Sequence, residues 1–473
     1  MMPMVYIILP VHNRRAITEK FIDCLVTQTY GAYHLILVDD GSTDGTEQMV
    51  KAKVGRLTVI KGSGDWWWAG SLQQGIGWLK QEGVADSDIV AFMNDDVLFE
   101  PDFLKMAVSL LDQHEGMLLP QVYNQGSGCI EESGVHADMK RLSFRTATSP
   151  QQINCLPTRG LFMRMSVLRR VGDFYPKWLP HYWSDYEYTL RAGRLGVMLR
   201  TTPKLLFKIN DDATGYRSFE GISFFDFLKK YFSKRSVLNP IYSSSFIILA
   251  SSKAYMPLSL IKVWSKAIMY ILRQLKRSIK MWLDNRRSLS AIRRSRNDLK
   301  IIIGSASTRQ SGWVSTNYPL LDLTNETTFS GLFEPNTVNN FLAEHVWEHL
   351  SLEDGVTACQ NCFTYLKRGG VLRIAVPDGY HPDPDYIAQV KPGGYGPGAD
   401  DHKALYNYQT LSATLERAGF KVSLLEWFDE RGQFNFVDWS DQNGFISRSS
   451  RFDERNQKTP LKYTSLIVDA TKI

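Results

Sequence analysis

The stretch LILVDDGSTDGT, residues 35–46, decides the fold of the first part of the chain. Its leading apolar run is typical of a buried strand, and two carboxylates follow that run directly. Similar apolar runs alternate with helical patterns around it and predict strands at 5–9, 35–38, 57–60 and 89–93 and helices at 16–27, 71–81 and 102–111. This alternation predicts an open, mostly parallel α/β sheet with helices on both faces.

Carboxylates stand at the ends of two predicted strands, where open α/β sheets bind ligands. Asp39 and Asp40 end one strand, and the triplet 94–96 (Asn-Asp-Asp) ends another. Adjacent carboxylates repel each other unless they bind donors or a cation, and a hard divalent cation combines one or two carboxylates with diphosphate oxygens. We therefore expect a nucleotide-diphosphate site with a metal. For the distal part of the motif the alternative is structural, with Asp44 and Glu47 capping the next helix.

These motifs make the region up to residue 220 resemble glycosyltransferase family 2, whose members have a GT-A fold. The resemblance rests on Pro-x-x-Asn at 10–13, on the stretch at 35–46, on the triplet at 94–96 and on Gly-Asp-Phe at 172–174 before an acidic helix. It implies an inverting enzyme that moves a sugar from a nucleotide-diphosphate sugar to a glycan or lipid-linked acceptor. It also implies a Mg²⁺ or Mn²⁺ cofactor.

The resemblance assigns roles to matching residues. The donor nucleotide would be bound by Pro10, Asn13, Asp39, Asp40 and Asp95, with Asp39 and Asp40 on the base and Asp95 on the ribose. Asp96 would bind the metal. The octet SDYEYTLR at 184–191 matches the start of the catalytic helix and makes Asp185 the general base, with helix capping as its structural alternative. Residues 210–212 (Asn-Asp-Asp) stand where many members carry a metal-binding His.

Three consecutive tryptophans resemble the Trp-rich loop of rhamnosyltransferase-like members of this family. Aromatic rings stack well on the CH faces of sugars and on bases. The residues expected to contact the sugar or the acceptor are Trp66, Trp67, Trp68 and Gly70. Packing between domains is the alternative.

Positive charge is concentrated in one segment. Residues 262–300 hold twelve Lys or Arg against two Asp, a local net charge of +10 in a chain whose formal net charge is +6. Apolar residues recur there every three or four positions, at Ile261, Trp264, Ile268, Ile271, Leu275, Ile279 and Trp282. The pattern predicts a basic amphipathic helix that either packs on a neighbouring domain or contacts an anionic membrane surface. Nucleic acid is not expected, because such proteins more often spread cationic and aromatic residues over a folded domain.

A second α/β domain is predicted after residue 297, with strands at 299–303, 339–343 and 371–376. Its motif order resembles a class I S-adenosylmethionine-dependent methyltransferase with a Rossmann-like fold. The cofactor would be bound by Gly304, Ser305, Asn317, Glu344 and His345. The loop at 304–307 reads Gly-Ser-Ala-Ser instead of Gly-x-Gly, and Asn317 replaces the usual ribose-binding Asp. A degenerate, non-catalytic binding module is therefore the alternative.

The segment HVWEH at 345–349 also matches the H-x-x-E-H pattern of inverted zinc peptidases. That pattern needs a further, distant ligand. The surrounding EHVWEHL fits the methyltransferase resemblance better, so zinc is not the expected outcome.

Taken together, the sequence predicts an enzyme with a glycosyltransferase domain at 1–220, a basic amphipathic helical connector at 221–297 and a methyltransferase-like domain at 298–473. Two rivals stay open: a methyltransferase whose first half only binds glycan, and a glycosyltransferase with a structural second half. Five scattered cysteines and the lack of a secretory pattern at the start predict a cytoplasmic protein, peripheral on the inner face of the membrane. Surface polysaccharide synthesis would suit both activities.

Overall fold

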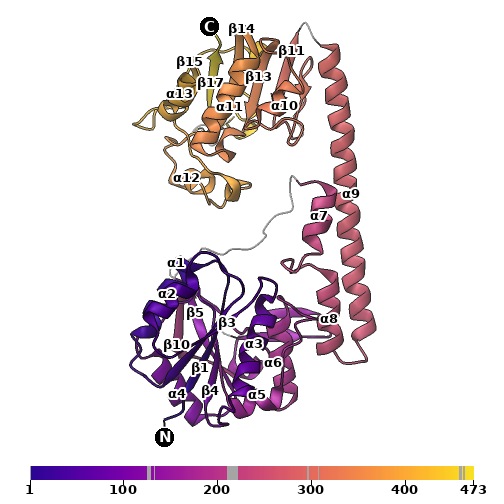
Figure 1. Ribbon diagram of the computed structural model, residues 1–473. Coiled ribbons are helices and arrows are strands. Elements are labelled where there is room, and N and C mark those ends of the chain that lie inside the picture. The colour runs from indigo at the N-terminus through magenta and orange to yellow at the C-terminus, as the bar shows by residue number, and fades with distance from the viewer. Residues whose placement is uncertain are drawn as a thin grey trace. The chain divides into compact units, whose positions relative to one another are not determined.

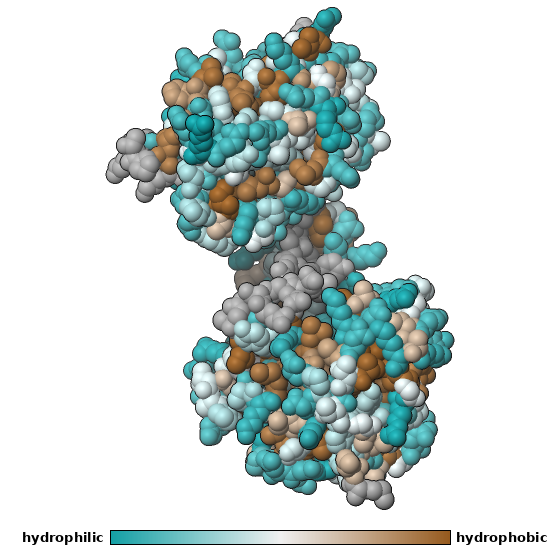
Figure 2. Space-filling model, turned by 90° about the vertical axis from the view of Figure 1, so that its left-hand side faces the viewer, coloured by the Kyte–Doolittle hydropathy of each residue, from teal (hydrophilic) through white to brown (hydrophobic). Residues whose placement is uncertain are grey.

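The computed structural model describes residues 2–124, 129–132, 134–209, 222–295, 298–306, 308–456, 461 and 464–473. The chain divides into two compact units, Met1–Gln274 and Leu275–Ile473. Each unit contains its own sheet (Figure 1). On the face shown in Figure 2, hydrophobic patches interrupt a largely hydrophilic surface on both units.

The first unit is built on a sheet with the strand order β10-β5-β9-β4-β1-β2-β3, to which β6 is added beside β5. Its elements are β1 (Val5–Val11), α1 (Arg15–Val26), β2 (Tyr33–Asp39), α2 (Thr46–Lys53), β3 (Leu57–Lys61), α3 (Trp67–Gln81), β4 (Ile89–Phe92), α4 (Phe103–Gln113), β5 (Met117–Asn124), β6 (Cys129–Glu132), β7 (Val135–Asp138), β8 (Ser143–Thr146), β9 (Leu161–Arg164), α5 (Met165–Val171), α6 (Ser184–Arg194), β10 (Leu199–Ile209), α7 (Phe224–Tyr231), α8 (Pro240–Ala250) and α9 (Met256–Arg294). Strands β1 to β4 are parallel, and β9 is antiparallel to both β4 and β5.

Helices cover both faces of this sheet, as predicted. In Figure 1, α1, α2 and α4 lie on one side and α3, α5 and α6 on the other. Each side has its own buried hydrophobic cluster, because neighbouring residues of a strand point to opposite faces: Ile7 faces the first cluster and Ile8 the second. The mixed α/β fold predicted for this part of the chain is thereby confirmed.

The order of the strands reverses beside β1. The chain runs from β1 outward to β2 and β3 and then returns to place β4 on the other side of β1. Such a reversal leaves a crevice at the carboxyl ends of the two strands that flank it. The predicted site residues 39–40 and 94–96 follow strands β2 and β4 and therefore belong to this edge.

One local prediction was wrong, and the structural alternative offered for Asp44 does not hold. Helix α3 begins at Trp67 and not at Ser71, so the tryptophans reach into its first turn. The cap of α2 is Gly45, with a φ of 83°, and no side chain caps this helix. Asp44 instead accepts hydrogen bonds from the backbone of Arg15 and Thr46, which joins the start of α1 to the start of α2.

Helices α7, α8 and α9 follow the sheet. Ala267 of α9 packs against Phe227 and Tyr231 of α7, and Trp264 donates a hydrogen bond to Ser244 of α8. Helix α9 has 39 residues and crosses the boundary between the units, so the region predicted as a separate connector is shared between them. In the part of the chain that the structure describes, no helix combines the length and the apolarity needed to cross a membrane.

The second unit contains a sheet with the order β12-β11-β13-β14-β17-β15-β16. Its elements are β11 (Leu299–Ile303), β12 (Val314–Ser315), α10 (Glu326–Ser330), β13 (Val338–Glu344), the 3₁₀ helix η2 (Trp347–His349), α11 (Leu352–Tyr365), β14 (Leu366–Pro377), α12 (Pro384–Val390), the 3₁₀ helix η3 (Ala399–Asp401), α13 (Tyr408–Arg417), β15 (Lys421–Phe428), β16 (Phe434–Phe436) and β17 (Ser465–Thr471). Strands β11 to β14 are parallel, whereas β17 is antiparallel to both of its neighbours.

The two faces of the second sheet are covered differently. Helices α10, α11 and α13 bury the larger cluster on one face. On the other face Trp439, Ile446 and Phe452, from a segment without long helices, pack over Ile302 and Leu342. The predicted second sheet is therefore present.

Candidate active site

The carboxyl ends of β1, β2 and β4 line a cleft of about 680 Å³. Its lining residues include Pro10, Arg14, Asp40, Trp67, Asp95 and His181. Residues that are far apart in the sequence thus meet at the strand ends, where the reversal of strand order predicts a crevice.

Asp40 organises one wall of this cleft. Its carboxylate accepts hydrogen bonds from the backbone N–H groups of Gly64 (2.8 Å), Trp66 (2.8 Å) and Trp67 (3.2 Å). The chain passes so close that a Cβ at Gly62 would lie 2.3 Å from Asp40 Oδ1. Asp39 beside it accepts the backbone N–H of Ser42 at 2.8 Å. Both carboxylates are buried and shape the loops that border the cleft.

Asn13 joins the loops that follow β1 and β2. Its side-chain oxygen accepts the backbone N–H of Thr43 at 2.8 Å, and its own N–H donates to Ser42 Oγ at 3.0 Å. Asn13 has a φ of 49°, in the left-handed region that Asn tolerates better than most residues. Trp67 and Trp183, which line clefts here, have positive φ values as well, and such backbone strain gathers at functional sites.

Asp95 and Asp96 both lie near the guanidinium group of Arg14. Asp95 is 3% exposed, accepts the Thr18 hydroxyl at 2.8 Å and lies 3.0 Å from Arg14 Nη1. Burial raises the pKa of Asp95, and the Arg14 guanidinium and the Thr18 hydroxyl oppose that rise. Asp96 Oδ2 is 3.7 Å from Arg14 Nη2.

The carboxylate of Asp96 is suited to bind the predicted metal ion. Its Oδ1 atom is buried and has no hydrogen-bond partner among the described residues. A buried oxygen without a donor is costly unless a ligand satisfies it, and a single carboxylate beside diphosphate oxygens suits Mg²⁺ or Mn²⁺. Residues 210–212, which stand where many family members carry a metal-binding His, lie outside the described residues.

Asp185 lines a second cleft, of about 590 Å³. This cleft shares four lining residues with the first: Trp68, Asn94, His181 and Tyr182. Asp185 is the second residue of α6, whose cap position is Trp183, without a side-chain cap. Its Oδ1 accepts the N–H of Tyr186 at 2.9 Å, so Asp185 does not occupy the cap position that the structural alternative gave it.

Glu187, the next acidic residue of α6, has a structural role. Its buried carboxylate pairs with Arg191 through two contacts of 2.9 Å. Arg191 also donates to the backbone carbonyls of Val171 and Asp173. This ion pair ties α6 to the Gly-Asp-Phe turn that follows α5.

The three tryptophans have two different roles. Trp67 lies beside Arg235, whose guanidinium is 5.3 Å from the ring centroid, and Trp68 donates to Thr158 Oγ1 at 3.0 Å. Both rings line clefts. Trp66 packs against the hydrophobic cluster beneath, and a Cβ at Gly70 would lie 3.1 Å from Trp66 Cβ.

The residues of the first cleft that the sequence analysis missed include three that carry or can carry positive charge: Arg14, His181 and Arg235. Arg14 directly follows the Pro-x-x-Asn motif, and that position was the available signal. His181 is neutral because burial, assisted by Arg235, lowers its pKa to about 4. Arg235 follows α7 and lies far along the sequence from the other residues of the cleft, so no local pattern reveals its position.

The residues predicted to bind S-adenosylmethionine lie at the carboxyl ends of β11 to β13. Asn317 accepts the N–H of Ala306 at 2.8 Å and donates to Ser305 Oγ at 3.0 Å, which shapes the loop after Gly304. Gly304 has a φ of 59°. The structure thus brings the loop and Asn317 together.

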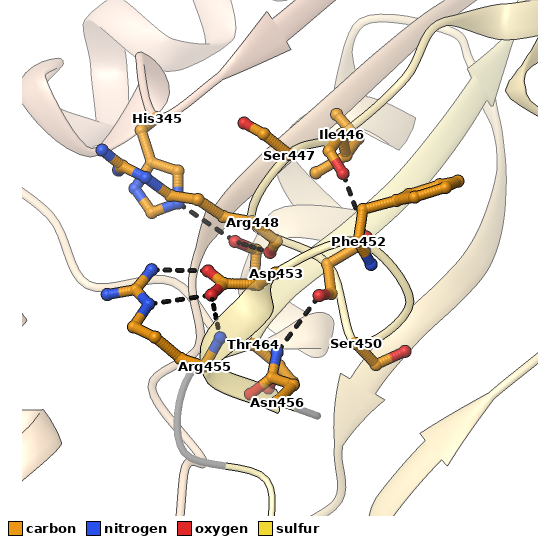
Figure 3. Close-up of polar contacts among 12 residues, drawn as sticks. His345, Ile446, Ser447, Arg448, Ser450, Phe452, Asp453, Arg455, Asn456 and Thr464 are labelled. Atoms are coloured by element: carbon orange, nitrogen blue, oxygen red, sulfur yellow. Dashed lines mark hydrogen bonds and ion pairs between the residues drawn. The ribbon is translucent and has the colours of Figure 1, made fainter. Parts of the chain in front are cut away.

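Glu344 and His345 bind a different part of the chain. Glu344 accepts the hydroxyl of Ser447 at 2.6 Å and the N–H of Arg448 at 2.8 Å. His345 Nε2 lies 3.0 Å from Ser465 Oγ, which donates in turn to the Arg448 carbonyl. Figure 3 shows His345 facing this loop.

The first site lies in an α/β domain, with paired carboxylates at the reversal of its strand order. Residues 6–172 match the model of glycosyl transferase family 2. The chain is 23% identical over 270 residues to the putative glycosyltransferase EpsE of Bacillus subtilis, covering 56% of this chain and 94% of that protein. It is 26% identical over 209 residues to glycosyltransferase AglE of Haloferax volcanii, covering 42% and 64%. Among solved structures, S. aureus TarS 1–349 in complex with UDP-GlcNAc is similar at 17% identity and a TM-score of 0.37, covering 55% of this chain and 71% of that one.

Proposed function

We propose that the first unit transfers a sugar, with inversion, from a nucleotide-diphosphate sugar to an acceptor hydroxyl. The observation that carries this proposal is the pair of clefts that share Trp68, Asn94, His181 and Tyr182. One cleft contains Asp95 and Arg14 and suits the donor; the other contains Asp185 and suits the acceptor. Their shared wall is where the two substrates would meet.

The residues of the two clefts supply the chemistry of a direct displacement. Asp185 accepts the proton of the acceptor hydroxyl while the hydroxyl oxygen attacks the anomeric carbon. Arg14 and Arg235 face the diphosphate with positive charge, and Trp67 and Trp68 hold the sugar or base by stacking. The metal at Asp96 would neutralise charge on the departing nucleotide diphosphate.

Thermal unfolding with nucleotide sugars tests this proposal. A donor present at 100 times its dissociation constant adds about 2.7 kcal/mol of stability. We expect one class among UDP-, GDP- and dTDP-sugars to raise the melting temperature, more with Mn²⁺ than without. The Mn²⁺-dependent part should be lost in Asp96→Asn. If no nucleotide sugar stabilises the protein, the proposal fails.

We place the acceptor among glycans or lipid-linked sugars of surface polysaccharide synthesis. The second cleft is bordered by Phe144, Trp183 and Tyr186, whose rings suit the CH faces of an extended sugar chain. Helix α9 supports a position at a membrane surface, because apolar residues recurring along one face are each more than half exposed: Leu258, Ile261, Ile268, Leu272, Ile279 and Trp282. Lys and Arg residues flank them.

Methyl transfer to the glycan is the second candidate function of the chain. The loop at 304–306 and Asn317 lie at the carboxyl ends of parallel strands, where α/β sheets bind ligands. The hydrogen bonds already made by Asn317 and Glu344 favour the alternative, a methyltransferase-like module without methyl transfer. Calorimetric titration of the full chain with S-adenosylmethionine tests cofactor binding, and the absence of heat supports the module. If heat is measured, transfer of a labelled methyl group to the glycan supports methyl transfer, and its absence supports a module that only binds.

A further inference from the structure

Three potential metal ligands meet in the second unit, away from the predicted cofactor loop in sequence. Glu348 and His349 belong to η2, just after β13, and His402 follows η3. One carboxylate oxygen of Glu348 and one ring nitrogen of each histidine all lie within 4.8 Å of one another. The two imidazole rings meet nearly at right angles, with an interplanar angle of 82°.

The backbone holds these segments together. The carbonyl oxygen of Glu348 accepts the N–H groups of Lys403 (2.7 Å) and Ala404 (3.1 Å). His402 Nδ1 lies 2.6 Å from the carbonyl oxygen of Val390 and therefore carries its proton toward that acceptor. The other ring nitrogen, Nε2, is left with a lone pair. A histidine that donates one ring N–H to a carbonyl and offers the other nitrogen is the usual arrangement of a metal ligand.

The cluster contains buried polar atoms that the protein itself leaves unsatisfied. Glu348 is 1% exposed; its Oε1 lies 2.9 Å from His345 Nδ1, whereas its Oε2 has no hydrogen-bond partner in the described part of the chain. His349 Nδ1 makes no hydrogen bond there either, although Asp401 Oδ2 lies 3.4 Å away. Buried polar groups in folded proteins are nearly always satisfied, so these atoms indicate a ligand.

We propose that Glu348, His349 and His402 bind a divalent transition-metal ion of the Zn²⁺ class. Two imidazoles and one carboxylate are a ligand set that Zn²⁺ accepts, whereas Mg²⁺ and Ca²⁺ prefer oxygen ligands alone. Three protein ligands leave a fourth position for water or for Asp401. His345 holds the Glu348 carboxylate in place and is a positioning residue for the metal.

This site goes beyond sugar transfer and differs from the oxygen-ligand site proposed at Asp96. It differs from the H-x-x-E-H peptidase pattern, because Glu348 replaces His345 as a ligand and His402 comes from a distant segment. It lies after the carboxyl end of β13, an edge where α/β sheets bind ligands. The bound ion would fasten the segment around His402 to the turn after β13.

The test measures Zn²⁺ binding by the full chain, using equilibrium dialysis and elemental analysis. The Asp96→Asn variant serves as the background, so that the site of the first unit does not contribute. We expect this background to bind one Zn²⁺, and the added change His402→Ala to weaken that binding by more than about 100-fold, because loss of a mere outer partner already costs 10–100-fold. Co²⁺ in place of Zn²⁺ should give visible absorption bands that disappear with His402→Ala.

Controls separate a metal site from adventitious binding. His114→Ala removes an exposed histidine of the first unit and should leave Zn²⁺ binding unchanged. His402 is half-buried, so its alanine variant should fold, and circular dichroism checks this. His349→Ala should weaken Zn²⁺ binding to the same extent as His402→Ala. The proposal is overturned if the background binds no Zn²⁺, or if folded His402→Ala and His349→Ala bind it as tightly as the background.

Discussion

Arg14 Nη1 lies 3.0 Å from Asp95 Oδ1 at the carboxyl ends of β1 and β4. This pair places a cation beside a nearly buried carboxylate in the cleft proposed for the donor. Without the guanidinium, the Thr18 hydroxyl is the side-chain donor that Asp95 retains among the described residues. The pair therefore bears both on stability and on donor binding.

For Arg14→Met we expect a loss of about 1–3 kcal/mol in the free energy of unfolding, the usual cost of a buried group left unsatisfied. Donor binding should weaken as well, because the diphosphate loses a cation. Chemical denaturation and donor titration measure the two effects. Arg15→Met, on the next residue, is the matched control; equal losses in both variants would contradict the role of Arg14.

Asp185→Asn should lower turnover by 10²–10⁴-fold, the usual contribution of a positioned general base, with little change in donor binding or melting temperature. Asp96→Asn should instead weaken metal-dependent donor binding. Sugar transfer rates and donor titrations distinguish the two variants. An Asp185→Asn protein that is destabilised but transfers sugar at a near-normal rate would sink the assignment of the base.

Glu187→Ala should destabilise the first unit by about 3–5 kcal/mol, because it leaves the buried Arg191 without its carboxylate. The double variant Glu187→Ala, Arg191→Met should recover part of this loss, since both charges are then gone. Urea denaturation of the two variants measures the difference. A stable single variant with lost sugar transfer would instead mean that Glu187 acts in the reaction.

His181 predicts a pH dependence of stability. Burial lowers its pKa to about 4 in the folded chain, against 6.5 for an exposed histidine, so the unfolded chain binds more protons between these values. Its contribution to stability is complete above pH 6.5 and is lost as the pH falls toward 4, by about 2 kcal/mol at pH 4.5. His181→Gln should lose less stability than the wild type between pH 7.5 and pH 4.5. His114→Gln, at an exposed position, should follow the wild type; a His181→Gln variant that does so too would refute this origin.

The exposed apolar face of α9 predicts binding to vesicles that contain anionic lipid. Each Lys or Arg near such a surface contributes about 1 kcal/mol, so binding should be strong at low salt and lost at high salt. Flotation measures it. Ile268→Asp should weaken binding, whereas Gln360→Asp, at an exposed position of α11, is a control for added charge. Wild-type protein that stays in solution with anionic vesicles at low salt would exclude the membrane role.

Strands β1 to β4 of the first sheet could be predicted because parallel strands covered on both faces are continuous apolar runs, and such runs are visible in the sequence. Strands β5, β6, β9 and β10 of the same sheet were not predicted. The first turn of α3 could not be predicted. Trp66 and Trp67 are held there by Asp40, more than twenty residues earlier, and a local pattern carries no trace of that contact. The structural alternative, in which Asp44 caps α2, does not hold for a related reason: the Asp44 carboxylate accepts a hydrogen bond from the backbone N–H of Arg15.

Some residues of the candidate site could likewise be predicted from the sequence, and others could not. Carboxylates at strand ends are visible because their position follows from the strands, so the neighbourhood of Asp95 could be inferred from the sequence. The charges that accompany them come from elsewhere. Arg235 lies beside Trp67 although the two are far apart in the sequence, and a hydrogen bond from the Lys403 N–H to the Glu348 carbonyl holds the segment of His402 near Glu348. Both depend on tertiary structure.

The wall shared by the two clefts constrains any attempt to redesign the enzyme. Trp68, Asn94, His181 and Tyr182 border both spaces, so a substitution there that admits a new acceptor also alters the room left for the donor sugar. Phe144 and Val237 border the second space alone. A library of variants aimed at new acceptors would therefore begin at those two positions, because substitutions there do not alter the lining of the first cleft.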